Sequence, residues 1–169
     1  DGYWLDQKYL VKAVQSLAPQ STGTLLDIGA AERQWDPLFA PYVDRHVGVE
    51  YPPSCENLTT GVSQWDAQDL GVVDLWCDGC QLPFKGESFD TALCIEVLEH
   101  VPEPDKVVSE AARVLKPGGR FLVTVPFTVS LHAVPFDFYR YTSHGLTALL
   151  ERHGFLIESL TPRGNYPAV

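Results

Sequence analysis

Short apolar runs that alternate with helical patterns are the feature that most constrains the fold of this chain. We expect strands at residues 24–29, 46–51, 72–78, 89–97, 120–127 and 155–160, and helices at residues 6–18, from Asp36, at 104–115 and at 143–153. Several of the runs are almost continuously apolar, which is typical of strands buried on both faces of a parallel sheet. The alternation therefore predicts an α/β fold, with a doubly wound, mostly parallel sheet covered by helices on both faces.

The expected helices carry their own start and stop signals. Asp36 followed by Pro37 is a typical cap with proline at the first helical position. Residues 104–115 form the clearest amphipathic pattern, and the KPGG that follows them should end this helix. Thr142 and Gly154 bound the last expected helix in the same way.

Length and charge narrow the class of protein. The 169 residues suit one domain that spans positions 1–169. A net charge of -10, from 12 basic and 22 acidic side chains, would repel a nucleic-acid backbone, because the basic residues are scattered. No run approaches the ~18 consecutive apolar residues that a membrane span needs. We therefore expect a soluble protein with neither nucleic acid nor a membrane as partner.

The four cysteines, in a chain without a secretory signal, indicate reduced thiols and a cytoplasmic location. Cys77 and Cys80 form a CxxC pair, but a zinc site needs two further ligands, and neither a second such pair nor an HxxxH follows. We therefore expect no metal. The chain has no methionine and stops soon after PRGNYP, so we expect both of its ends to be trimmed.

Acidic residues stand at the ends of several expected strands. Ligands of parallel sheets bind outside the carboxyl ends of the strands. Glu50 follows Gly29 by 21 positions, where a carboxylate can accept hydrogen bonds from both hydroxyls of a ribose. Asp78 ends the third expected strand and could accept from an adenine amino group. An acid after a strand is common, but two that face one crevice favour a nucleoside site.

The order of the segments LLDIGA, VGVE, DGCQLPFKGESFD, CIEVLEHV and ARVLKPGGRFLVTVPF resembles that of the class I S-adenosylmethionine-dependent methyltransferases. The closest likeness is to the small-molecule branch with LPF and EVLEHV signatures, the type 11-like methyltransferases, and it covers about residues 23–160. It implies a Rossmann-like sheet whose seventh, antiparallel strand inserts between the fifth and sixth. Only nine residues follow Leu160, so we expect this last strand to be missing or truncated.

The resemblance also implies roles for the residues at the strand ends. The first-strand loop would hold the methionine part of S-adenosylmethionine, Glu50 would take the ribose hydroxyls, and Asp78 would read the adenine. Glu96 and Val97 would line the methyl-donor region. The full set of expected cofactor residues is Asp27, Gly29, Ala30, Arg33, Glu50, Tyr51, Asp78, Gly79, Glu96 and Val97.

The loop after the first strand departs from the family pattern, because Ala31 and Arg33 stand where glycines are usual. A non-glycine residue at positive φ costs roughly 1 to 2 kcal/mol, so we expect the loop to take a different backbone path. S-adenosylmethionine has no phosphate, and the missing glycines therefore argue against a dinucleotide more than against this cofactor. We expect Arg33 to pair with the cofactor carboxylate or to block the pocket.

The acceptor side centres on the segment SLHAVPFDFYRYT, which resembles the H…P.D.YRYT segment of some bacterial methyltransferases. His132 and His100 are the candidate general bases, since a histidine has a suitable intrinsic pKa. The expected substrate residues are Asp137, Tyr139, Arg140 and Tyr141. The same segment could instead be a structural latch, in which Asp137 pairs with Arg140 and the tyrosines pack. An acceptor that is already nucleophilic would need no base.

The predicted function is methyl transfer from S-adenosylmethionine to a hydroxyl or amine of a small molecule. A degenerate, non-catalytic binding or interaction module on the same fold is the alternative. An NAD-dependent oxidoreductase is disfavoured, because DIGAAERQ lacks the required glycine spacing. The sequence does not determine the acceptor or the oligomeric state.

Overall fold

The computed structural model describes residues 2–52 and 73–163, with side chains described from residue 7 onward. Its elements are α1 (Gly2–Leu17), η1 (Ala18–Gln20), β1 (Thr24–Ile28), α2 (Asp36–Phe39), β2 (Arg45–Glu50), β3 (Leu75–Trp76), β4 (Phe89–Ile95), η2 (Leu98–His100), α4 (Pro104–Val114), β5 (Leu115–Thr124) and α5 (Ser143–Arg152). The expected starts and ends of the helices are close to those observed. Thr142 caps α5 by accepting a hydrogen bond from the amide of Gly145.

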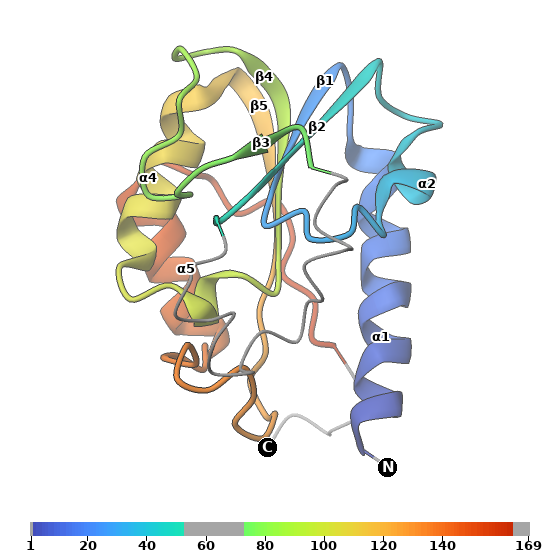
Figure 1. Cartoon of the computed structure of the whole chain (residues 1–169), viewed down its shortest axis with the longest axis vertical. Coiled ribbons are helices and arrows are strands. Elements are labelled where there is room, and N and C mark those ends of the chain that lie inside the picture. Colours follow the sequence, from blue (N-terminus) through green and yellow to red (C-terminus); the bar gives the residue numbers. More distant parts are fainter. Residues whose placement is uncertain (1, 53–72, 164–169) are drawn as a thin grey trace.

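The described strands form one parallel sheet in the order β3-β2-β1-β4-β5. The order reverses beside β1, which lies between β2 and β4. In open α/β sheets, ligands bind outside the carboxyl ends of the strands at such a reversal. Helices cover both faces of the sheet: α1 and α2 lie on one side, and α4 and α5 on the other (Figure 1). The predicted doubly wound, mostly parallel α/β fold is confirmed.

Two apolar cores hold the helices against the sheet. The core under α1 and α2 includes Val14, Leu25 and Phe39. The core under α4 and α5 includes Leu26 and Val108. Because successive residues of a strand point to opposite faces, adjacent residues of β1 contribute to different cores. This two-sided burial explains the nearly continuous apolar runs in the sequence.

One expected strand is wrong. Residues 155–160 do not form a strand, although the chain there alternates in burial. Phe155 packs on Phe121 of β5 with ring centroids 5.1 Å apart, while Leu156 is 91% exposed. A strand needs a neighbour to accept its backbone hydrogen bonds. The family topology places another strand between this segment and β5, and no such strand occurs in residues 2–52 or 73–163.

Other expectations near the ends of elements are refined. β5 begins at Leu115 rather than at residue 120, so the KPGG that ends α4 lies within a strand, opposite an irregularity in its pairing with β4. The polar stretch before β3, the start of the strand expected at 72–78 and the residues available for a seventh strand beyond position 163 lie outside the described residues. Within the described ranges, no helix combines the length and apolar character that crossing a bilayer requires.

Candidate active site

The loop that follows β1 is tied to the end of β2. The amides of Gly29 and Ala30 both donate to the carbonyl of Val49, at 2.9 and 3.0 Å. Gly29 has φ +81°, and a Cβ atom at this position would lie 2.3 Å from Cγ2 of Val97. Only glycine fits here, because both the backbone conformation and the approach of Val97 exclude a side chain.

The loop keeps its left-handed path without glycine, which contradicts the expectation of a different backbone route. Ala31 has φ 44° and Arg33 has φ 57°, so both bear the strain. Each residue makes contacts that offset the cost. Ala31 donates its amide to Oε2 of Glu50 at 2.9 Å, and the Arg33 side chain pairs with two carboxylates. Strained residues persist where their surroundings over-determine them.

Arg33 is held by two acids and a carbonyl. Its guanidinium contacts Asp36 at 2.8 Å and Asp74 at 2.6 Å, and donates to the carbonyl of His46 at 3.1 Å. Only 15% of the side chain is exposed. The guanidinium thus lies beside the body of β2, engaged with acids of this chain. Its expected role toward a cofactor carboxylate stays a prediction.

Glu50 is placed at the end of β2 with both carboxylate oxygens oriented by the backbone. Oε2 accepts from Ala31, and Oε1 accepts from the amide of Tyr51 at 2.8 Å. Burial raises the pKa of Glu50, and the two amides act in the opposite direction. Each oxygen keeps a lone pair, so the carboxylate can still accept from two hydroxyls. The Tyr51 side chain is 62% exposed.

Asp78 and Gly79 follow β3 at the neighbouring strand end. Oδ1 of Asp78 accepts from the amide of Cys80 at 2.8 Å, which fixes the carboxylate and leaves Oδ2 for another donor. A Cβ on Gly79 would lie 3.2 Å from Ile28, so the backbone of this turn packs closely on β1. Glu50 and Asp78 therefore end adjacent strands of the sheet, as predicted.

Asp27 has a partner that sequence reasoning missed. Its side chain is buried within β1, and Oδ2 lies 3.3 Å from Nε2 of His46 on β2. The other ring nitrogen of His46 lies 3.1 Å from Asp36. In the parallel register of β1 and β2, Leu26 lies beside Val47 and Asp27 lies beside Gly48. His46 directly precedes Val47, so its side chain can reach that of Asp27. The cofactor role expected for Asp27 stays a prediction.

Glu96 and Val97 follow β4. Glu96 has φ 54°, and its Oε1 accepts from the hydroxyl of Thr124 at 2.8 Å. Arg163 also reaches this carboxylate, with nitrogen–oxygen distances of 2.8 and 2.9 Å. Val97 packs on Gly29, as described above, and so joins the ends of β1 and β4. The carboxyl ends of β1 and β4 are therefore in contact.

The segment 130–141 is internally braced. Asp137 makes two contacts with Arg140, at 2.6 and 2.8 Å, and also accepts from the amide of His132 at 2.9 Å. The guanidinium of Arg140 holds the pKa of Asp137 well below its usual range. The hydroxyls of Tyr139 and Tyr141 donate to the carbonyls of Pro102 and Leu98. These contacts agree with the latch alternative for the four residues.

His100 and His132 lie together. Their ring centroids are 4.8 Å apart with the planes nearly perpendicular. Burial lowers the pKa of His100, which favours the neutral ring. Beside them lies Glu99, which the sequence analysis missed: its side chain is fully buried, and burial raises its pKa to about 8. Its position between Leu98 and His100 in EVLEHV was the available signal, since an acid inside an otherwise buried segment needs a reason.

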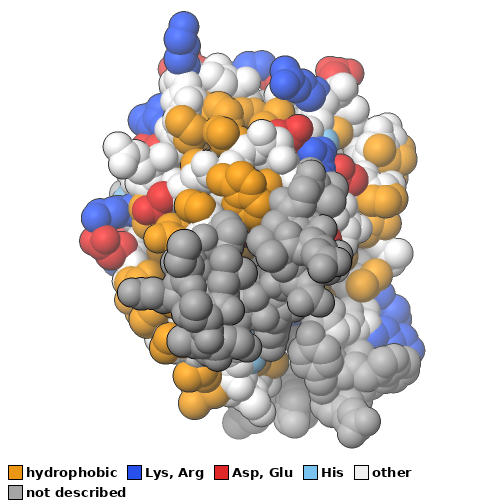
Figure 2. All heavy atoms as spheres, in the orientation of Figure 1, with side chains coloured by type: hydrophobic (Ala, Val, Ile, Leu, Met, Phe, Trp, Pro, Cys, Tyr) orange, Lys and Arg blue, Asp and Glu red, His pale blue; other side chains and the backbone are white. Residues whose placement is uncertain are grey.

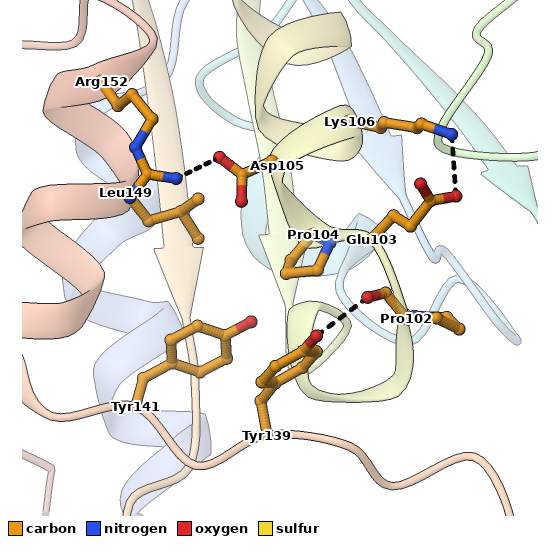
Figure 3. Close-up of a pocket in the computed structure, with 9 residues that line it drawn as sticks. All are labelled: Pro102, Glu103, Pro104, Asp105, Lys106, Tyr139, Tyr141, Leu149 and Arg152. Atoms are coloured by element: carbon orange, nitrogen blue, oxygen red, sulfur yellow. Dashed lines mark hydrogen bonds and ion pairs between the residues drawn. The ribbon is translucent and has the colours of Figure 1, made fainter.

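A shallow hollow of about 510 Å³ opens behind this segment, between the start of α4, the tyrosines and α5 (Figure 3). It is lined by Pro102, Glu103, Pro104, Asp105, Lys106, Tyr139, Tyr141, Leu149 and Arg152. Charged side chains at its rim pair with each other: Lys106 with Glu103, and Arg152 with Asp105. The hollow is therefore on the α4–α5 side of the sheet, away from the loop after β1.

Comparison with known proteins places this geometry in a family. Residues 26–123, more than half of the chain, match the family described as methyltransferase domain. The chain belongs to this methyltransferase family. A relative from Mycolicibacterium smegmatis named as a probable S-adenosylmethionine-dependent methyltransferase is 28% identical over 165 residues, which are 94% of this chain and 61% of that protein. The methyltransferase domain described here thus spans less than two thirds of that relative.

Solved structures show the same fold. A candidate methyltransferase from Bacillus halodurans superposes with a TM-score of 0.67, at 24% identity, over 89% of this chain and 70% of that one. The 1,6-didemethyltoxoflavin-N1-methyltransferase of Burkholderia thailandensis has a TM-score of 0.65, at 22% identity, over 89% of this chain and 69% of its own. That structure contains 1,6-didemethyltoxoflavin and S-adenosylhomocysteine. The class I methyltransferase fold is therefore confirmed, and the cofactor of this family is S-adenosylmethionine.

Proposed function

We propose that this methyltransferase domain binds S-adenosylmethionine and transfers its methyl group to a hydroxyl or amine of a small molecule. The observation that carries the proposal is the anchored carboxylate of Glu50, whose oxygens are oriented by the amides of Ala31 and Tyr51. The left-handed backbone at Ala31 and Arg33 supports it, because the loop path survives the loss of the usual glycines.

The residues of the crevice fit this cofactor chemically. Gly29 leaves room where a Cβ would meet Val97, Glu50 can accept from vicinal hydroxyls, and Asp78 retains a free carboxylate oxygen for an amino group. When bound, S-adenosylmethionine supplies a methyl carbon on a positively charged sulfonium sulfur. Acids at the strand ends suit a ligand with donor groups and positive charge.

Several features support a small acceptor. The net charge is -10, and on the face seen in Figure 2 the Lys and Arg side chains are separated rather than gathered in a basic patch. The segment 130–141 carries three exposed aromatic side chains, of Phe136, Phe138 and Tyr139, and the backbone carbonyl of Phe136 accepts from His100. The Burkholderia thailandensis structure holds a small heterocyclic ligand together with S-adenosylhomocysteine, which is consistent with this class of acceptor.

A non-catalytic binding module is the second candidate, and one contact favours it. Arg163 pairs with Glu96 at the end of β4, in the region expected for the methyl donor. An arginine retained there would oppose a sulfonium cation by charge repulsion. Cofactor binding decides between the two functions, because the module needs no adenosyl ligand.

Calorimetric titration of the purified protein with S-adenosylmethionine and S-adenosylhomocysteine tests the proposal, with NADH as the control ligand. We expect the two adenosyl ligands to bind and NADH not to bind. Glu50→Ala should abolish this binding, while Glu151→Ala, an exposed acid on α5, should leave it unchanged. Transfer of a labelled methyl group to a panel of small hydroxyl and amine acceptors then follows. A folded protein that binds neither adenosyl ligand would support the binding module instead.

A further inference from the structure

We propose that Glu99, His100 and His132 form a binding site for one divalent transition-metal ion. Each of the three offers a ligand atom, and these atoms all lie within 4.8 Å of one another. Nε2 of His100 and Oε1 of Glu99 are 3.7 Å apart. The two neighbours in sequence meet His132 from a distant segment, so the cluster is made by the fold.

The state of Glu99 points to a ligand. Its side chain is fully buried, yet neither carboxylate oxygen has a hydrogen-bond partner among the described residues. A buried carboxylate without hydrogen-bond partners loses the free energy of hydration without the hydrogen bonds that would replace it. A cation held beside the imidazoles would compensate the charge of this carboxylate.

In both imidazoles Nδ1 contacts groups outside the proposed site, as is usual for metal-binding histidines. Nδ1 of His100 donates to the carbonyl of Phe136, which leaves Nε2 with its lone pair on the side of Glu99. Nδ1 of His132 lies 3.1 Å from the carbonyl of Ser130 and 3.6 Å from Asp137. These contacts to backbone and carboxylate orient the rings and select the tautomer that can bind a metal ion.

The donor set indicates the class of ion. Two imidazoles and one carboxylate suit Zn²⁺ and the neighbouring divalent transition metals, and three protein ligands leave open positions for another group. Ligands about 2.0–2.1 Å from zinc in a tetrahedron are about 3.3–3.4 Å apart. Nε2 of His100 and Oε1 of Glu99, at 3.7 Å, are already close to this separation. His100 and His132 are 25% and 34% exposed, which provides a path of entry.

A second group of possible ligands is less suited to a metal ion. Asp27, Asp36 and His46 also bring three ligand atoms together. Both ring nitrogens of His46, however, already lie within ion-pair distance of a carboxylate, at 3.3 and 3.1 Å. In this group both acids lie within 3.3 Å of the histidine, whereas Glu99 lies 3.7 Å from His100 and has no hydrogen-bond partner among the described residues.

The CxxC pair is a poor competitor for the ion. Burial raises the pKa of Cys77 and of Cys80 to about 11, and adjacent Asp78 adds to the shift. Thiols bind metal as thiolates, so a raised pKa opposes binding. The expectation of no metal was based on this pair, and the proposed site uses none of its atoms.

The role that we assign to the ion depends on the proposed methyl transfer, whereas the metal site itself does not depend on it. A hydroxyl next to a divalent cation loses its proton more readily, so the site favours an oxygen acceptor over an amine. The proton leaves to solvent. The acceptor oxygen then forms a bond to the methyl carbon as the carbon–sulfur bond breaks, and the electron pair of that bond stays on sulfur. The imidazoles would thus hold the ion rather than act as the general bases expected from the sequence.

The test is titration of the chelator-treated protein with Zn²⁺ by calorimetry and with Co²⁺ by visible absorption, without any cofactor. We expect one ion per chain. His132→Gln and Glu99→Gln should each weaken binding at least tenfold, while His144→Gln, an exposed histidine on α5, should bind as the parent does. Circular dichroism confirms that each variant is folded, and His132→Gln, in a partly exposed loop, remains informative if Glu99→Gln is not.

Three results would overturn the assignment. These are a folded protein that binds no stoichiometric ion, unchanged affinity in folded His132→Gln, and a near-ultraviolet thiolate-to-cobalt charge-transfer band, which would locate the ion at the cysteines. Because the titration uses metal alone, failure here is separate from failure of adenosyl binding. The outcome of each experiment can therefore be assigned to its own proposal.

Discussion

The backbone amide of Ala31 donates to Oε2 of Glu50 at 2.9 Å, which joins the loop after β1 to the end of β2. The bond spans 19 positions in the sequence. It lets a residue other than glycine hold a left-handed conformation and at the same time orients the carboxylate expected to bind ribose. Loop shape and ligand recognition therefore depend on the same contact.

Glu50→Gln should weaken S-adenosylhomocysteine binding by about 10- to 100-fold. The amide side chain has one acceptor oxygen and one donor group, so it cannot accept from both Ala31 and Tyr51, and a hydrogen bond to a charged group is worth about 1.5–3 kcal/mol. Calorimetry measures the effect, with Glu151→Gln as the matched exposed control. Equal affinity in the parent and Glu50→Gln would remove Glu50 from the ligand site.

Arg33→Ala should be less stable than Arg33→Gly by about 1 kcal/mol. Both variants lose the ion pairs with Asp36 and Asp74, but only alanine keeps the strain of φ 57°. Urea denaturation gives the two free energies of unfolding. Adenosyl ligand affinity in Arg33→Gly should stay within a few-fold of the parent, since the guanidinium contacts acids beside β2. A large loss in this variant would instead assign Arg33 to the cofactor.

Gly29→Ala should lower the free energy of unfolding by about 1–3 kcal/mol and abolish adenosyl binding. The new Cβ would lie 2.3 Å from Cγ2 of Val97, and φ of +81° is unfavourable for alanine. The double variant Gly29→Ala/Val97→Ala removes the clash but keeps the strain. A double-mutant cycle should therefore show partial recovery. Strict additivity would mean that the two side chains do not meet.

Stability should fall as the pH drops below about 4, and Asp90 should contribute to this loss. Hydrogen bonds from Lys116 and from the amide of Thr24 lower the pKa of Asp90 in the folded state. A lowered folded pKa means that the unfolded chain binds the proton first, so the stabilisation is present above the unfolded pKa and is lost as the pH falls through the folded one.

Asp90→Asn should accordingly flatten the dependence of the free energy of unfolding on pH between 3 and 5. At pH 7 the variant should be less stable by about 1 kcal/mol, because the ion pair is partly exposed. Urea midpoints across this range, compared with those of Glu87→Gln as an exposed control, measure the effect. The same slope in Asp90→Asn and the parent would contradict the assignment.

The order of the chain and its local patterns determined the sheet, the flanking helices and the acids at the strand ends. Burial on both faces of β1 and β4 requires continuous apolar runs, and helix caps act within a few residues, so both leave signals that can be read locally. The segment 155–160 has such a pattern but lacks a neighbouring strand, and pairing is a property of the whole sheet.

Only the tertiary structure decided how the unusual loop and the buried acid are accommodated. Ala31 and Arg33 keep a strained path because Glu50, Asp36 and Asp74, which lie up to 41 positions away, compensate for it. Glu99 meets His132 only after the segment 130–141 folds over the end of β4. Local propensity cannot report such contacts, because their free energy comes from groups that folding alone brings within a few ångströms of each other.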